Sequence, residues 1–147
     1  MKITQILLAE HVVFHNLFDH IEKSAPRQKT HAEIRSLAAT LETLLRAHSQ
    51  TEDELFIGPL EHCLEQIGHR DIFHQEHDEI DATLLAAQKA KTVKTARKFL
   101  LSAVAASRKH FDKEERIVFP LAERMLNAKT LSELGAEWMR RREAALK

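Results

Sequence analysis

The amino-acid sequence predicts an all-α fold: an antiparallel up-down-up-down four-helix bundle with a short inter-helix turn and a fifth, C-terminal helix. The chain is rich in Ala, Leu, Glu and Lys and contains only 3 Gly, 3 Pro and no Tyr, a composition that favours helix over sheet. Apolar residues recur every three or four positions along four long stretches. The connections between these stretches are short, as in bundles whose neighbouring helices run antiparallel.

The first two helices are predicted over residues 4–23 and 30–57. The stretch SAPRQ ends the first, because proline cannot continue a helix interior. Gly58 and Pro59 kink or end the second, and the stretch LEHCLEQIG is predicted as a short helical turn that Gly68 caps. The inward-facing positions are Leu7, His11, Phe14, Phe18 and Ile21 in the first helix, and Ile34, Leu37, Leu41, Leu45, His48, Glu52 and Leu55 in the second.

The next two helices are predicted over residues 71–89 and 92–119, with Pro120 as an interruption after the second. Both continue the pattern of apolar residues spaced by three and four. Their inward-facing positions are Phe73, His77, Ile80, Leu84 and Ala87 in the third helix, and Ala96, Leu100, Ala103, Ser107, His110, Glu114 and Ile117 in the fourth.

A fifth helix is predicted over residues 130–147. Thr130 and Glu133 have the spacing of a capping box, which marks a helix start. Leu131, Leu134, Trp138 and Leu146 are expected to dock this helix on the bundle, although they could also form a dimer contact. No linker is long enough to separate two domains, so the sequence predicts a single domain over 1–147, with the bundle at about 4–124.

Charge and cysteine content exclude several classes of protein. Lys+Arg and Asp+Glu both number 22, so the formal net charge is zero, and neither a nucleic-acid partner nor a membrane surface is expected. No stretch approaches the roughly 18 apolar residues of a membrane span, and the N-terminal apolar run is too short for a signal peptide. With Cys63 as the single cysteine there is no internal disulfide, so a cytoplasmic location is expected.

The two halves of the chain resemble each other. AEHVVF (9–14) matches QEHDEI (75–80), and RAHSQTEDELFIGPL (46–60) matches RKHFDKEERIVFPL (108–121). Each half therefore has a histidine in its first helix and a His-x-x-x-Glu pair in its second, all within the apolar stripes. These six side chains are His11, His48, Glu52, His77, His110 and Glu114.

The six side chains are expected to meet in one layer and to surround a cation. A His and a Glu four residues apart share one helix face. In each half, the histidine of the first helix lies about 20 Å from the turn that joins the two helices, and the histidine of the second lies about 27 Å from it. The two halves are alike in this respect, so the six side chains can lie at one level. An unpaired carboxylate in a core costs several kcal/mol, so the alternatives are a metal or an empty, neutralised core. Imidazoles and carboxylates suit iron, manganese or zinc, and two carboxylates on opposing helices can bridge two metals.

This pattern is similar to that of the haemerythrin-like (HHE cation-binding) domain, over about Thr4 to Arg124. The resemblance implies a four-helix bundle with a non-haem di-iron centre, that is, two Fe ions with an oxo or hydroxo bridge, which Zn or Mn could replace. It also implies that the histidines are terminal ligands and that the glutamates bridge the irons. The terminal ligands would be His11, His48, His77 and His110, and the bridges Glu52 and Glu114.

The sequence departs from the oxygen-carrying haemerythrins at two positions. Phe73 stands where they have an additional histidine, and the last carboxylate, Glu114, follows His110 by four residues, whereas theirs is an aspartate that follows by five, the place of Glu115 here. Simple reversible O2 transport is therefore not favoured. Four residues remain as further ligands or as groups that orient a ligand: His15, His74, Asp81 and Glu115.

Two functions remain open. The first is a protein that binds or senses O2, NO, peroxide or a related small oxidant at an open coordination position, as a monomer or homodimer. The second is a di-iron enzyme of peroxide reduction or of iron and nitric-oxide stress handling. A ferritin-like carboxylate oxidase is set aside, because its helices need Glu-x-x-His and no Glu in this chain has His three residues later. The remaining histidines, His20, His31, His62 and His69, are predicted at the surface.

Overall fold

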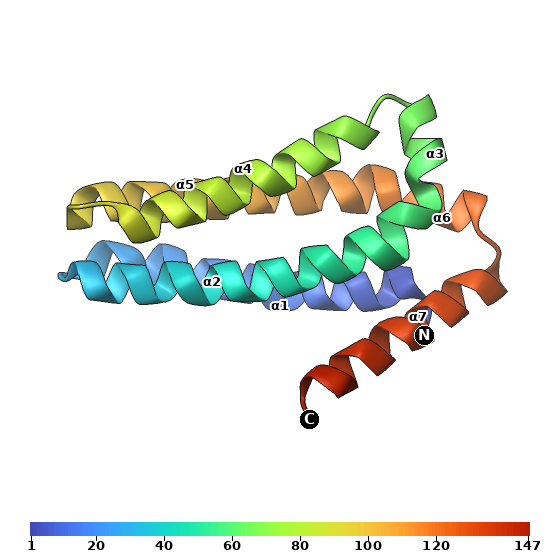
Figure 1. The fold of residues 1–147 in the computed structure, drawn as a ribbon, viewed down its shortest axis with the longest axis horizontal. Helices are drawn as coiled ribbons and strands as arrows, with labels where there is room; N and C mark the ends of the chain where they lie inside the picture. Colours follow the sequence, from blue (N-terminus) through green and yellow to red (C-terminus); the bar gives the residue numbers. More distant parts are fainter.

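The structure, a computed structural model, describes all residues 1–147 and is helical without any strand, which confirms the predicted all-α class. Four long helices lie alongside one another (Figure 1). The connection between the first two is short and contains the 3₁₀ turn at Ala25–Arg27, and the connection between the last two is the short segment 90–92. The four helices are α1 (Ile3–Ser24), α2 (His31–Glu52), α4 (Arg70–Lys89) and α5 (Val93–Lys113).

Threonine side chains begin the second and fourth of these helices. The Oγ1 of Thr30 accepts a hydrogen bond from the N–H of Glu33 at 3.3 Å, and that of Thr92 accepts from the N–H of Thr95 at 3.1 Å. Each satisfies one of the backbone donors that a helix leaves unpaired at its start. These two caps place the starts of α2 and α5 where the sequence predicted them.

The C-terminal helix α7 (Ala128–Ala145) starts earlier than predicted. Its cap is Asn127, whose side-chain oxygen accepts the N–H of Thr130 at 2.8 Å. Thr130 therefore lies inside the first turn, and the predicted capping box of Thr130 with Glu133 is wrong. Asn127 takes the role because its extended backbone points a short acceptor at the free N–H groups.

Helices α2 and α5 each continue into a single π-helical turn, Asp53–Ile57 and Glu114–Val118. Short helices follow them, α3 (Gly58–Gln66) and α6 (Phe119–Met125), each with a proline in its first turn. A π turn contains about one residue more than an α turn, so it moves the buried face along by one position. The inward residue after the second pair is consequently the fully buried Val118.

The predicted inward position of Ile117 is therefore wrong, because that side chain is only partly buried. The two π turns lie at nearly equivalent places in the two halves of the chain, one starting directly after Glu52 and the other at Glu114 itself. This agreement shows that the internal duplication extends to the backbone.

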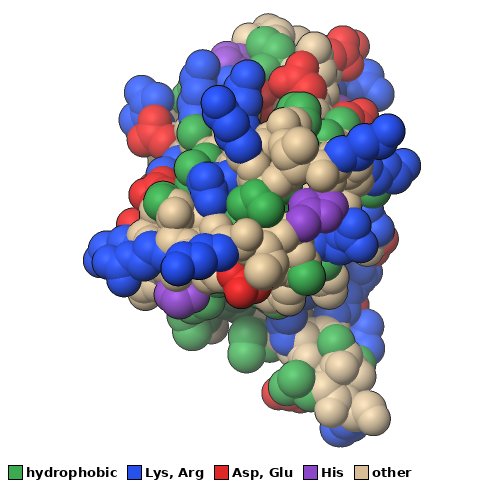
Figure 2. Space-filling model, turned by 90° about the vertical axis from the view of Figure 1, so that its left-hand side faces the viewer, with side chains coloured by type: hydrophobic (Ala, Val, Ile, Leu, Met, Phe, Trp, Pro, Cys, Tyr) green, Lys and Arg blue, Asp and Glu red, His purple; other side chains and the backbone are tan.

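The core consists of two apolar clusters with a layer of buried polar side chains between them. One cluster contains Phe18 and Leu100 and lies towards the turns that join the long helices. The other contains Leu7 and Trp138 and lies towards α3, α6 and α7. Seen from the turn end, the molecule presents charged side chains of both signs with scattered apolar ones (Figure 2). None of the helices combines the length and apolar character that a membrane crossing requires.

Candidate metal centre

The buried polar layer brings together the six side chains that the sequence singled out. Four of the long helices contribute a histidine each, and both glutamates are fully buried. Their nitrogen and oxygen atoms form two groups, within each of which the atoms lie within 4.8 Å of one another. The groups are Glu52, His77, His110 and Glu114, and His11, His48 and Glu52. Glu52 belongs to both.

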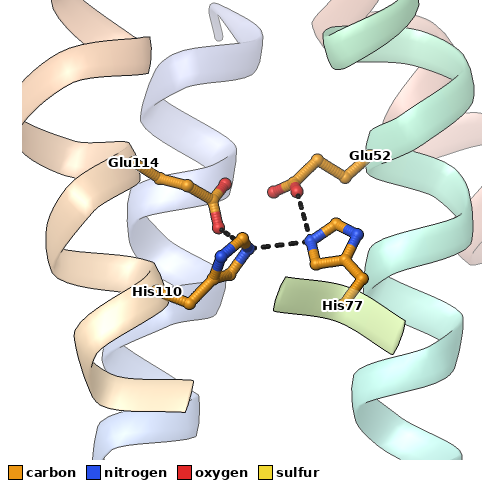
Figure 3. Close-up of side chains that lie close together, drawn as sticks. All are labelled: Glu52, His77, His110 and Glu114. Carbon is orange, nitrogen blue, oxygen red and sulfur yellow. Dashed lines mark hydrogen bonds and ion pairs between the residues drawn. The ribbon is translucent and has the colours of Figure 1, made fainter. Parts of the chain in front are cut away.

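Figure 3 shows the first group, with side chains from three helices pointing towards one another. Nε2 of His110 lies 2.8 Å from Oε1 of Glu114 and 2.7 Å from Nε2 of His77. Oε1 of Glu52 lies 3.6 Å from the same nitrogen of His77. On its other side, Oε2 of Glu52 lies 3.2 Å from Nε2 of His48, so this carboxylate connects the two groups.

The outer edge of every imidazole faces a carboxylate from a neighbouring helical segment. Three pairs are hydrogen-bonded at Nδ1, and in the fourth, His77 with Asp53, the two atoms are at ion-pair distance, 3.4 Å apart. A donor Nδ1–H leaves the lone pair of Nε2 directed at the centre, and this is how proteins orient metal-binding histidines. The hydrogen-bonded pairs are His11 with Glu115 at 3.0 Å, His48 with Glu10 at 3.2 Å, and His110 with Glu76 at 3.4 Å.

Most of the inner atoms are buried without a hydrogen-bond partner, although Glu52 and Glu114 each lie at ion-pair distance from an imidazole. These atoms are Nε2 of His11, Nε2 of His48, and both carboxylate oxygens of Glu52 and of Glu114. Buried polar atoms are almost always satisfied in folded proteins, because leaving one unpaired costs free energy. Imidazole nitrogens and carboxylate oxygens are also the donors that iron, manganese and zinc accept. The residues therefore fit a metal, which would pair all of these atoms at once.

The charged groups within the cluster shift one another's pKa values. Burial, together with the nearby Glu52 carboxylate, raises the pKa of Glu114 well above its usual range. Burial also works against the charged form of Glu52, but its contacts with His48 outweigh this effect and lower the pKa of Glu52. Burial likewise opposes the charge on His48, yet Glu10 and Glu52 raise the pKa of that imidazole to about 9. Without a cation, these pKa shifts favour the neutral form of Glu114 and the charged form of His48.

His11 behaves differently from His48. Burial, followed by the charge on His48, lowers the pKa of His11 to about 3, so this imidazole is neutral and available as a ligand. Its ring stacks on Phe111, with the ring centroids 3.8 Å apart and the planes 4° from parallel. Phe111 therefore fixes the plane of His11 while Glu115 fixes its rotation within that plane.

The four additional candidates lie in different places. Glu115 holds Nδ1 of His11 and so has the orienting position. His15 is outside the cluster: its ring meets Phe111 edge-on, and Arg108 donates a hydrogen bond to its Nδ1 at 3.0 Å. His74 is also outside it, since its side chain is 44% exposed and lies 3.6 Å from Glu61 of α3.

Asp81 is half-buried one turn beyond His77 on α4 and forms no hydrogen bond with an imidazole. Burial raises its pKa. The structure therefore brings neither His15, His74 nor Asp81 to the centre as a ligand. The histidines predicted at the surface also lie away from it: His20 and His62 are exposed, and His31 and His69 are half-buried.

Sequence reasoning missed three of the four orienting carboxylates, Glu10, Asp53 and Glu76. The duplication contained signals for all of them. A glutamate precedes the histidine of the first helix in each half, giving Glu10-His11 and Glu76-His77, and an acidic residue follows each buried glutamate, giving Asp53 and Glu115. Equivalent acidic positions beside equivalent ligands would have indicated a shared role.

Comparison with known proteins agrees with this geometry. The chain matches the hemerythrin HHE cation binding domain over residues 2–122, a segment that includes all six clustered side chains and the four orienting carboxylates. Neither a curated protein nor a solved structure matches the chain. The resemblance seen in the sequence is thereby confirmed. The chain belongs to the family of hemerythrin HHE cation-binding domains.

Proposed function

We propose that the chain holds two metal ions, iron in the cell, in the core of an antiparallel four-helix bundle formed by α1, α2, α4 and α5, and that it binds or senses O2, NO or a related small oxidant there. The observation that supports two ions is the position of Glu52, whose two oxygens face different histidine groups. A carboxylate in that position can serve two cations at once.

The two ions would have different surroundings. His77, His110 and Glu114 would hold one of them, and His11 with His48 would hold the other. Glu52 would be common to both. The first ion therefore receives one more carboxylate than the second, which makes the two positions chemically distinct.

The donor set favours a small ligand. Six side chains supply fewer donors than two six-coordinate ions require, so positions stay open for an added molecule. Bound iron would supply those open positions and a reversible change of oxidation state. The chain contributes orientation through the carboxylates at Nδ1, and it excludes bulk water through rings packed around His11, including Phe111 and Phe119. Only a small molecule fits such a buried place.

The test is elemental analysis with a visible and near-ultraviolet spectrum on protein loaded with iron, followed by stopped-flow mixing of the reduced protein with O2 and with NO. The proposal predicts one ion for each of the two groups, and a spectrum that changes on mixing. The variant His110→Ala should lose both the iron-dependent spectrum and the response. Less than half an ion per chain, or no spectral change with either gas, would contradict the proposal.

The same reduced protein distinguishes binding from catalysis. A single stoichiometric spectral change with O2 or NO supports a binding or sensing role. Continued consumption of hydrogen peroxide with an added reductant would instead support an enzyme.

A further inference from the structure

The duplicated halves complete the surroundings of their histidines by different means. In the second half, Glu76 holds Nδ1 of His110 and is itself paired with Lys113 of α5 at 2.6 Å. The ring of Phe73 meets His110 edge-on, with centroids 5.6 Å apart and planes at 71°. Lys113 lies three residues after His110, and Phe73 lies four residues before His77. The bundle itself thus supplies a cation and an aromatic ring.

The first half lacks both groups at the equivalent positions. Three residues after His48 stands Thr51, which has no charge, and four residues before His11 stands Leu7, which has no ring. Glu10, the counterpart of Glu76, would therefore have no cation from the bundle to fix it. A carboxylate that is free to turn is a poor support for the imidazole it faces.

Helix α7 supplies both missing groups. Nη2 of Arg142 donates to Oε1 of Glu10 at 2.9 Å, and its Nη1 donates to Oγ1 of Thr51, the residue in the lysine's place, at 3.3 Å. The fully buried Trp138 meets His48 edge-on, with centroids 5.7 Å apart and planes at 68°. Its indole N–H also donates to Oε2 of Glu10. Both oxygens of Glu10 are therefore held from α7.

We propose that Trp138 and Arg142 are positioning residues of the metal centre: they fix Glu10, and Glu10 in turn orients His48 for the ion shared by His11, His48 and Glu52. This role depends on the proposed function. The role of α7 concerns this ion and not the one at His77 and His110, because the ammonium group of Lys113 already pairs with Glu76 beside His110. Both residues lie beyond the segment 2–122 that matches the family.

The experiment is an anaerobic Fe²⁺ titration of the full chain, in competition with a chelator, for wild type, Arg142→Met, Trp138→Phe, Lys113→Met and Arg140→Met. Trp138 is the single Trp, and there is no Tyr, so quenching of its fluorescence reports occupancy beside His48. Arg142→Met should move the midpoint of the Trp138 quenching to about 10–100-fold higher free Fe²⁺. The affinity for the other ion, at His77 and His110, should stay as in wild type. Trp138→Phe, read by iron content, should lose the same ion.

The two remaining variants are controls. Lys113→Met should weaken the other ion without moving the Trp138 quenching midpoint. Arg140→Met should behave as wild type, because Arg140 is exposed and pairs with Glu137 on the same helix. A merely structural role of α7 would weaken both ions together in Arg142→Met, and that result would overturn the proposal.

The outcomes separate this inference from the proposed function. Wild type that binds two ions, with the same midpoints in Arg142→Met, would overturn the role of α7 alone. Wild type that binds no Fe²⁺ would overturn the metal centre and this role with it. Selective loss of the ion beside Trp138 supports both.

Discussion

The Nε2 atoms of His77 and His110 lie 2.7 Å apart, although these residues come from different helices. Two neutral acceptor nitrogens repel each other at that distance unless a proton or a cation lies between them. In the metal-free chain one of the two rings must donate. A metal would satisfy both lone pairs, which explains why the fold can hold two imidazoles in this arrangement.

The shared position of Glu52 predicts unequal effects of removing the two buried carboxylates. Glu52→Gln should lower the affinity for both ions, because Glu52 faces both histidine groups. Glu114→Gln should lower mainly the affinity for the ion at His77 and His110, and should retain about one ion per chain. Elemental analysis after gel filtration measures the difference. Equal loss in the two variants would mean that Glu52 does not serve both positions.

Removal of the metal should destabilise the fold. A ligand at 100 times its dissociation constant that binds only the native state contributes about 2.7 kcal/mol, or about 5–10 °C in Tm for a chain near 150 residues. Thermal unfolding followed by circular dichroism, with iron and with chelator, measures this shift. His110→Ala should show a smaller iron-dependent shift, because only the ion at His11, His48 and Glu52 remains; a shift of wild-type size in that variant would place the ion elsewhere.

The raised pKa of Glu114 predicts a pH-dependent gain for Glu114→Gln in the metal-free protein. A group whose pKa is raised on folding stabilises the native state at low pH, and this contribution is lost as the pH rises through the folded-state pKa. Gln needs no proton, so the variant should melt a few degrees above wild type at pH 8, and the difference should shrink towards pH 5. Thermal melts at both pH values in chelator measure it.

The same variant should gain no stability from iron at the position it alters. A lower Tm than wild type at pH 8 in chelator would show that Glu114 is ionised in the metal-free core.

The positions of His15 and His74 predict that neither is required for metal binding. His15→Ala and His74→Ala should bind iron with wild-type stoichiometry, because His15 pairs with Arg108 outside the cluster and His74 faces Glu61 near the surface. His77→Ala, three residues from His74, should lose at least one ion and serves as the matched control. A drop in iron content for His74→Ala would show that α4 rotates when the metal binds.

Gly135 should be essential for the docking of α7. A Cβ at this position would overlap the carbonyl oxygen of Met1 and lie 3.1 Å from the backbone nitrogen of Ile3. Gly135→Ala should therefore push α7 away from α1 and reproduce the effect of Arg142→Met on the ion beside Trp138. Trp138 fluorescence in the metal-free protein should shift to longer wavelength as its ring becomes exposed. Ala136→Ser, on the exposed side of α7, is the control.

Much of this centre was determined by the sequence itself. The period of the apolar residues placed the long helices, and a histidine or glutamate inside an apolar stripe can be recognised without a structure, because facing the core is a local property of a helix. Since His48 and Glu52, and His110 and Glu114, are four residues apart, their shared direction also follows from helix geometry alone.

Tertiary structure decided the rest. The π turn at Glu114–Val118 shifts the buried face from Ile117 to Val118, and the apolar pattern did not mark this turn in advance. Which carboxylate reaches which imidazole also depends on how adjacent helices rotate and slide against each other. The contact of Arg142 with Glu10, 132 residues apart in the chain, depends on where α7 docks.

Periodicity along one helix determines which side chains face inward, because the backbone repeats every 3.6 residues whatever surrounds it. The pairing of those side chains across helices depends on angles, offsets and packing that only the whole folded chain sets. For this protein the six clustered residues followed from the first kind of information. Their supporting carboxylates, the sharing of Glu52 and the contribution of α7 followed only from the second.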